Sequence, residues 1–183
     1  MYTKIIPADI SHASVIAAIG KKSFRNAFEH LFRNKEELFE YLEYSYSPVK
    51  LAKSLRKENN VYFLAFREAE PVGFAKIKKH SLNDQIESGA QMELQKIYIL
   101  PEHQGAGIGS ALLKEVKDLA IEISPDYIWL DTHISNENAV RLYEKNGFKK
   151  VANYSFLIGT QIFDYYVMGL PISLTVSAWL TMK

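Results

Sequence analysis

The chain has 183 residues, a formal net charge of +1 and no cysteine. This length suits a single domain with a sizeable core, and the lack of cysteine excludes disulfides, a thiolate nucleophile and cysteine-ligated metal sites. The near-neutral charge argues against nucleic acid or an anionic membrane surface as the main partner. No apolar run in the sequence reaches the roughly 20 residues that a membrane-spanning helix needs, so we expect a cytoplasmic protein.

The first third of the chain predicts one short strand and three helices. Asp9 or Ser11 can cap the first helix and Asn34 the second, because side-chain oxygens of these residue types accept hydrogen bonds from free N–H groups at a helix start. Pro48 is expected to break the second helix. The predicted elements are a strand over 2–6 and helices that run to about residue 28, from 34 to 47 and from 50 to 59.

The middle and end of the chain predict strands interspersed with two helices. Apolar residues over 61–66 and 71–79 indicate an antiparallel hairpin. A strand, a helix and a second strand over 91–134 imply a parallel pair joined by a crossover. The remaining predicted elements are a helix from Ser135 or Asn136 to Glu144 with Gly147 as its C-terminal cap, and a hairpin over 148–156 and 160–169 around Gly159.

Residues 171–183 form an apolar tail in which apolar and polar residues alternate from Ile172 to Leu180. A period of two is typical of a strand. An extra edge strand or a subunit contact in a homodimer is one interpretation, and a disordered end is the other. Residues 1–170 are predicted to form the single domain.

Three glycines at alternate positions, Gly105, Gly107 and Gly109, separate an apolar strand from an amphipathic helix. A helix start presents free N–H groups and the positive end of the helix dipole, and glycine lets the backbone approach a bulky anion. We therefore expect this turn to hold the diphosphate of a nucleotide-type cofactor. A Rossmann turn and a Walker A loop both need other spacings or a lysine that this chain lacks, and a plain tight turn is the remaining alternative.

Two motifs together carry a resemblance to a known family. Gln104 to Gly109 fits the pattern Q/R-x-x-G-x-G/A, and Asn136 to Phe148 fits N-x-x-A-x-x-x-Y-x-x-x-G-F, in the right order and separation. Over about residues 2–170 the chain resembles the GNAT superfamily of N-acetyltransferases. The resemblance implies a GNAT-like α/β (α+β) fold, with a mixed central sheet of about seven strands, a splayed parallel pair and flanking helices.

The resemblance also implies acetyl-coenzyme A (acetyl-CoA) as the cofactor. Backbone groups of the strand before the turn would hold the pantetheine arm, and the turn would bind the pyrophosphate. Many relatives have arginine at the first motif position, whereas Gln104 adds no charge. The implied cofactor-binding residues are Ile97, Tyr98, Ile99, Gln104, Gly105, Ala106, Gly107, Ile108, Gly109, Ser110, Asn136, Ala139, Tyr143 and Lys145.

Two catalytic residues follow from the same resemblance. Tyr143 would protonate the departing thiolate, and Glu93 would accept the proton of the amine, directly or through water. Asp131 is a second candidate base. A tyrosine packed on its own helix and a solvated strand-end carboxylate are the alternative interpretations. The five histidines show no metal-ligand spacing, so no metal is expected.

The acceptor is predicted from the N-terminal helices, which form the acceptor wall in this family. The implied substrate-binding residues are Phe28, Glu29, Phe32 and Glu93. The pattern S-F-x-x-x-F at residues 23–28, followed by E-E-L-F-E-Y-L at 36–42, is similar to the bacterial polyamine (spermidine/spermine) N-acetyltransferase branch. Carboxylates would suit a polycation, and aromatic faces would add cation–π contacts. A solvated helix face over an aromatic core is the alternative.

The leading hypothesis is acetyl transfer to a primary amine of a small molecule. A protein N-terminal or lysine acetyltransferase, a non-catalytic acyl-CoA-binding sensor and a regulator that prefers ATP remain alternatives.

Overall fold

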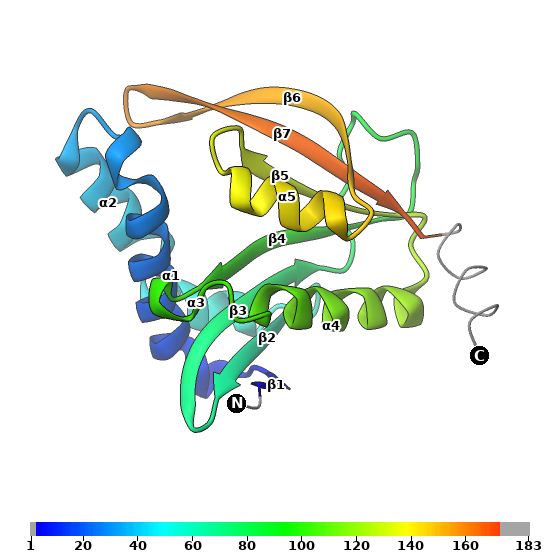
Figure 1. The fold of residues 1–183 in the computed structure, drawn as a ribbon, viewed down its shortest axis with the longest axis horizontal. Coiled ribbons are helices and arrows are strands. Elements are labelled where there is room, and N and C mark those ends of the chain that lie inside the picture. Colours follow the sequence, from blue (N-terminus) through cyan, green and yellow to red (C-terminus); the bar gives the residue numbers. More distant parts are fainter. Residues whose placement is uncertain (1–2, 173–183) are drawn as a thin grey trace.

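The structure is a computed structural model that describes residues 3–172. Seven strands form one sheet in the order β1-β2-β3-β4-β5-β7-β6 (Figure 1). Within the described part of the chain, β4 and β5 are the one parallel pair of neighbours. The strands are β1 (Thr3–Pro7), β2 (Asn60–Arg67), β3 (Glu70–Lys78), β4 (Gln91–Ile99), β5 (Tyr127–His133), β6 (Lys149–Ile158) and β7 (Gln161–Pro171). The predicted mixed sheet with flanking helices is confirmed.

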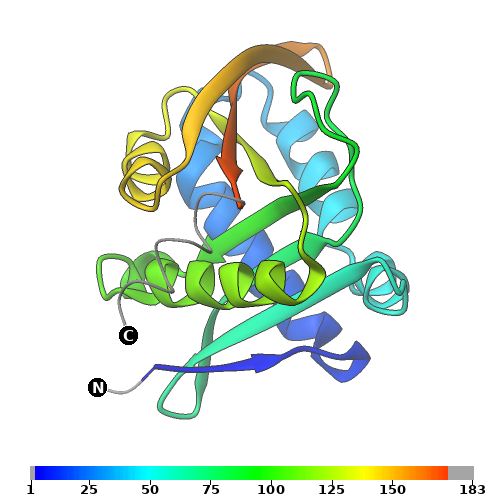
Figure 2. The same cartoon turned by 90° about the vertical axis from the view of Figure 1, so that its right-hand side faces the viewer.

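Helices cover both faces of the sheet. Helix α4 lies across one face, and the N-terminal helices lie against the other (Figure 2). Buried apolar residues of α4 such as Leu112 and Val116 pack on the strands, and burial of each such side chain stabilises the fold by about 1.5–3 kcal/mol. The helices are α1 (Ala13–Phe28), α2 (Lys35–Ser45), α3 (Pro48–Leu55), α4 (Ile108–Ile123) and α5 (Glu137–Lys145), with single 3-10 turns η1 (Ile10–His12), η2 (Glu29–Leu31) and η3 (Pro101–His103).

The helix starts follow the expected capping chemistry, with one correction. Asn34 Oδ1 accepts a hydrogen bond from the Glu36 amide at 2.9 Å, as predicted. The prediction of a helix from 50 to 59 is wrong, because α3 begins at Pro48 and ends at Leu55. Proline suits the first position of a helix since its missing N–H group would have no partner there. At the other end, the Asn60 side chain donates to the Ser54 carbonyl at 2.8 Å and closes the last turn.

Strands β4 and β5 pair over only three residues and then diverge. Gln91 to Glu93 pair with Tyr127 to Trp129, after which β4 stays on β3 and β5 continues on β7. The register between β3 and β4 shifts at this point, so that Gln95 is an extra residue in β4. Such a β-bulge bends its strand. The predicted splayed pair is therefore present, and the bulge lies where the splay begins.

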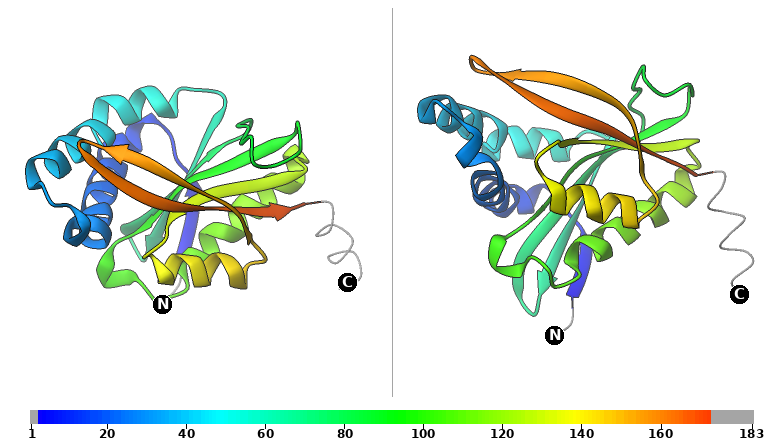
Figure 3. Two further views of the ribbon diagram at one scale, coloured as in Figure 1. Left: turned by 90° about the horizontal axis from the view of Figure 1, so that it is seen from above. Right: turned by 45° about the horizontal axis from the view of Figure 1, so that its top comes forward.

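Strands β6 and β7 form a long twisted ribbon that extends to α2 (Figure 3). At its tip, Thr160 donates its amide and its hydroxyl to the Glu37 carboxylate at 3.0 and 2.8 Å. The ribbon and the N-terminal helices thus border the space where β4 and β5 diverge. The alternating tail predicted over 172–180 lies outside the described residues, apart from Ile172.

Candidate active site

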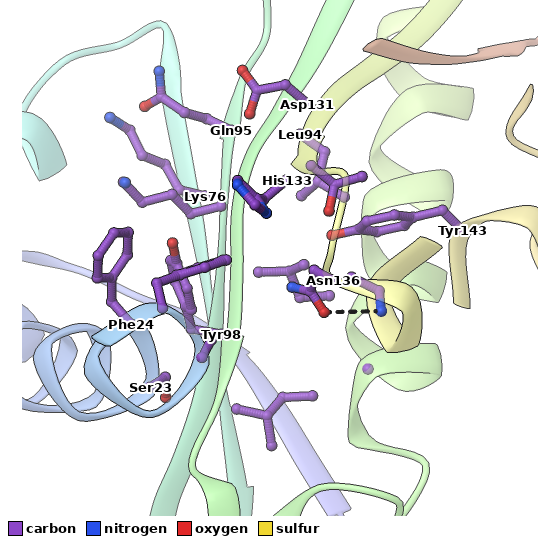
Figure 4. Close-up of a pocket in the computed structure, with 18 of the residues that line it drawn as sticks. Ser23, Phe24, Lys76, Leu94, Gln95, Tyr98, Asp131, His133, Asn136 and Tyr143 are labelled. Atoms are coloured by element: carbon purple, nitrogen blue, oxygen red, sulfur yellow. Dashed lines mark hydrogen bonds between the residues drawn. The ribbon is translucent and has the colours of Figure 1, made fainter. Parts of the chain in front are cut away.

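A cleft with a volume of about 1590 Å³ opens where β4 and β5 diverge. Lys76, Tyr98 and Phe24 lie on one side of β4, and Asn136 and Tyr143 lie on the other (Figure 4). The cleft therefore has two halves. The half that faces α4 and α5, named the cofactor half below, contains the glycine turn and polar residues of α5. The half that faces α1 and α3, named the acceptor half, contains aromatic and lysine side chains.

The glycine turn is open to the cleft. Gly105 and Gly107 have φ angles of +75° and +81°, which side-chain-bearing residues rarely adopt. A Cβ atom added to either glycine would meet nothing within 4 Å, so the space beside them is open to a ligand. Gly107 is the N-cap residue of α4, so no side chain caps the free N–H groups at the start of this helix. Gly109 serves a different purpose, because a Cβ there would lie 3.0 Å from Leu142 of α5.

The edge of β4 that faces β5 has no strand partner after Glu93 in the part of the chain that the structure describes. Ile97, Tyr98 and Ile99 pair with β3 on their other side and line the cleft. Backbone polar groups at such an edge need partners when they are covered. An extended chain with amide groups, such as a pantetheine arm, fits this edge. The Gln104 side-chain amide donates to the Ile99 carbonyl at 3.3 Å and ties the strand end to the turn.

Helix α5 supplies the opposite wall. Asn136 Oδ1 accepts a hydrogen bond from the Ala139 amide at 3.3 Å, so this side chain caps the helix (Figure 4). Tyr143 lies two turns later, is buried and points into the cleft (Figure 4). Burial raises the pKa of the Tyr143 hydroxyl far above its ordinary value, with a smaller contribution from Asp131. The hydroxyl therefore stays protonated at neutral pH and can donate a proton.

Two carboxylates lie at the fork between the strands. Glu93 is the last residue of β4 that pairs with β5, and its Oε2 atom contacts Lys78 Nζ at 2.8 Å and Ser81 Oγ at 2.7 Å. Asp131 lies two residues beyond Trp129, the last residue of β5 that pairs with β4, and its carboxylate accepts a hydrogen bond from the Tyr154 hydroxyl at 2.6 Å. Burial raises the pKa of Asp131, whereas the hydrogen bond from Tyr154 lowers it.

Most residues predicted to bind a cofactor line this one cleft. Of the predicted set, Ala106 and Lys145 are not among the lining residues. Those that line it are Ile97, Tyr98, Ile99, Gln104, Gly105, Gly107, Ile108, Gly109, Ser110, Asn136, Ala139 and Tyr143. The open glycine turn, the uncapped helix start and the unpaired strand edge therefore fit a coenzyme A molecule.

The predicted acceptor residues divide differently. Phe28 and Glu93 line the cleft, but Glu29 and Phe32 do not. Phe32 is buried against Phe24 and Phe163 because it belongs to the aromatic core between α1 and β7, and the Lys35 ammonium donates to the Glu29 carbonyl at 2.7 Å outside the cleft. None of the acidic residues of α2 lines the cleft either.

Sequence reasoning missed the side chains that dominate the acceptor half. Lys76 and Lys96 come from directly opposite positions of β3 and β4. Ser23 of α1 has a buried hydroxyl group with no hydrogen-bond partner in the described structure, although it lines the cleft. The bulge at Gln95 reverses the alternation of β4, so the face on which Lys96 lies could not be read from the sequence.

His133 also lines the cleft, but residues 3–172 contain no group of three or more potential metal ligands.

Comparison with known proteins agrees with this geometry. The sequence model described as "Acetyltransferase (GNAT) family" matches residues 22–148. An uncharacterised N-acetyltransferase of Mycobacterium tuberculosis (strain H37Rv) is 26% identical over 159 residues, which is 87% of this chain and 97% of that protein.

Among residues 3–172, the helices are too short or too polar for any of them to span a membrane.

Two solved structures share the fold at low sequence identity. The PaiA N-acetyltransferase of Thermoplasma acidophilum, in complex with coenzyme A, has a TM-score of 0.75 at 20% identity and covers 93% of this chain and 99% of that one. A spermidine N-acetyltransferase SpeG chimera from Vibrio cholerae and hSSAT has a TM-score of 0.70 at 19% identity, with coverage of 96% and 99%.

The family match spans more than half of the chain, so this protein belongs to the GNAT family of acetyltransferases. It is an acetyl-CoA-dependent enzyme, as the cleft geometry and the family both indicate.

Proposed function

We propose that this enzyme transfers the acetyl group of acetyl-CoA to a primary amine of a small molecule, in a ternary complex of enzyme, cofactor and acceptor. The observation that carries the proposal is the single cleft in which an anion-binding turn, an unpaired strand edge, a buried tyrosine and a buried carboxylate converge. Direct transfer needs no enzyme nucleophile, and the chain has no cysteine that could serve as one.

The cofactor half of the cleft would act mainly through the main chain. Amide groups from Gln104 to Ser110 would bind the pyrophosphate, and the edge from Ile97 to Ile99 would hold the pantetheine arm. Bound acetyl-CoA supplies an acetyl group that is activated as a thioester. Asn136 keeps its capping role and presents its amide nitrogen to the same cleft.

Proton transfer at the fork requires one acid and one base. An alkyl ammonium has a pKa near 10 and must lose a proton before its nitrogen can attack a carbonyl carbon. We propose that Asp131 accepts this proton, since burial raises the pKa of its carboxyl group and Glu93 Oε2 is held by Lys78 and Ser81. Glu93 remains the second candidate. Tyr143 Oη supplies the proton that the departing sulfur takes up.

A thiol-release assay with acetyl-CoA and a panel of primary amines tests this function. Formation of coenzyme A and acetylated amine at the same rate is the expected result. Turnover with N-terminal peptides but with no small amine would assign the enzyme to protein acetylation. Thermal stabilisation by acetyl-CoA without any transfer would support a sensor, and stabilisation by ATP alone would support a nucleotide-binding regulator.

One observation favours the polyamine hypothesis and another does not. The likeness to a spermidine N-acetyltransferase chimera favours it. The acidic residues of α2 give it no support, because none of them lines the cleft: Glu37 contacts the hairpin tip and Glu43 pairs with Lys21 at 2.6 Å. Polyamines therefore belong in the amine panel as one class among several.

A further inference from the structure

We infer that the acceptor carries an anionic group, a carboxylate or a phosphate, in addition to its amine, and that Lys76 and Lys96 bind this group. This inference rests on the proposed function, because it names the substrate class of the same cleft. Its basis is the arrangement of positive charge on the acceptor half, which is unusual for a surface that would receive a cation.

Lys76 and Lys96 form a like-charged cross-strand pair. Their Cα positions are direct partners in the β3–β4 ladder, and both side chains line the cleft. Like charges at directly opposite positions of a sheet destabilise it. Neither Nζ atom has a carboxylate oxygen within 4.0 Å in residues 3–172, whereas their neighbour Lys78 is paired with Glu93. The closest polar contact of Lys96 Nζ is the Tyr46 hydroxyl at 3.5 Å.

Helix α3 and the turn after it add positive charge to the same wall. Lys50, Lys53 and Lys57 also line the cleft, which brings its lysines to six. The lining holds three carboxylates, and one of them, Glu137, is paired with Arg141 at 2.9 Å on the α5 side. The acceptor half is therefore net positive before any ligand binds. A polycation would be repelled there, whereas an anion would bridge the two lysines.

The pKa values of the pair agree with this arrangement. Burial, followed by the repulsion of Lys96 and Lys78, lowers the pKa of Lys76 to about 8. Burial also lowers the pKa of Lys96 to about 8; the attraction of Asp131 opposes this shift, and the repulsion of Lys50 adds to it. An anion placed between the two ammonium groups would remove the repulsion and hold both lysines in the charged form.

The lysine pair shares one cleft with the fork, because Lys96, Asp131 and Tyr143 all line it. Asp131 and Lys96 interact electrostatically although they form no ion pair, and Asp131 interacts in the same way with Tyr143. An acceptor whose anion lies on the lysine pair therefore extends its amine toward the fork. The rings of Phe24 and Tyr98 line the same part of the cleft and would contact the carbon chain between the two groups.

A matched series of amines tests the inference. The probes are 4-aminobutanoate, butylamine and 1,4-diaminobutane, which differ at the end remote from the reacting amine, and 3-aminopropyl phosphate, which separates phosphate from carboxylate recognition. We expect kcat/KM for at least one anionic amine to exceed that for butylamine by about 10- to 100-fold, which is the effect of a charge-assisted hydrogen bond. Lys96→Met and Lys76→Met should each abolish most of this preference and leave acetyl-CoA affinity unchanged.

The controls make each outcome decisive. Lys149→Met removes an exposed lysine of β6 that does not line the cleft and should change nothing. The inference is overturned if 1,4-diaminobutane is the best acceptor, if all four amines react equally, or if the preference survives in Lys96→Met. Thermal shift by the anionic amines is measured in parallel. Lys96-dependent binding without transfer would uphold the anion site and refute the proposed function, whereas the absence of both binding and transfer would refute the anion site.

Discussion

Lys96→Met should make the protein more stable at neutral pH. The wild-type ammonium is charged at pH 7 in a partly buried place, and burial lowers its pKa from 10.5 to about 8. A full shift of this size corresponds to about 3 kcal/mol, at about 1.4 kcal/mol per pKa unit. The open cleft lets water reach the side chain, and contacts with the Tyr46 and Tyr98 rings at 5.1 and 5.8 Å offset part of the cost. We therefore expect a net gain of about 1–2 kcal/mol.

The sign of the pH dependence gives a second check. Between about pH 8 and pH 10.5 the unfolded chain keeps its Lys96 proton, whereas the folded chain has lost it. The wild-type protein therefore gains stability as the pH rises through this window, and the advantage of Lys96→Met should shrink between pH 7 and pH 10.

Urea denaturation at pH 7 and pH 10 measures both effects, and the melting temperature at pH 7 should rise by about 2–8 °C. Lys149→Met is the matched control, and its stability should stay within about 0.5 kcal/mol of wild type. A Lys96→Met protein that is no more stable than wild type at pH 7, or whose advantage does not change with pH, would refute the reasoning. A more stable variant that loses its anionic acceptor would show that the lysine serves binding at the expense of the fold.

Three further variants test the cofactor half and the fork. Tyr143→Phe should lower kcat by about 10²–10⁴-fold with unchanged acetyl-CoA affinity, while Tyr166→Phe, outside the cleft, keeps full activity; equal rates would remove Tyr143 as the acid. Gly107→Glu should abolish acetyl-CoA binding in calorimetry through bulk and charge, whereas Gly107→Ala carries only the strain of a positive φ, about 1–2 kcal/mol; normal binding by the glutamate variant would contradict the anion turn. Asp131→Asn should reduce kcat by more than tenfold and Glu93→Gln by less, and the reverse order in the same assay would assign the base to Glu93.

The cofactor half was predictable because its signals are local. A strand, a glycine turn and a helix lie within one continuous stretch, and the positive φ angles and open space at Gly105 and Gly107 are what glycine at these positions predicts. Asn136 and Tyr143 are seven residues apart on one helix, so their common face follows from helix geometry. The placement of Asn34 as a cap is local in the same sense.

The acceptor half was not predictable because its residues come together only in the folded sheet. Lys76 and Lys96 are brought together by the register of β3 and β4. That register contains a bulge that the residue pattern does not predict. Glu29 and Phe32 were expected beside the acceptor because the N-terminal helices form the acceptor wall in the family that the sequence resembles. A single 3-10 turn, η2, follows α1 instead, and Phe32 enters the core beside Phe163.

The two halves of the cleft would therefore recognise their ligands through different groups, the cofactor through the main chain and the acceptor through side chains. In the proposed function, main-chain groups and glycines would recognise the cofactor by shape and by the dipole of α4. Glutamine at position 104 in place of arginine would then remove one charge and leave the turn intact. The proposed acceptor would instead contact side chains from five elements, α1, α3, β3, β4 and β5, that line the cleft. Because a β-strand alternates its faces, β4 can hold the cofactor along its edge while Lys96 and Tyr98 face the acceptor. Changes at Lys76 or Lys96 should consequently alter which amine is acetylated without altering which cofactor is bound.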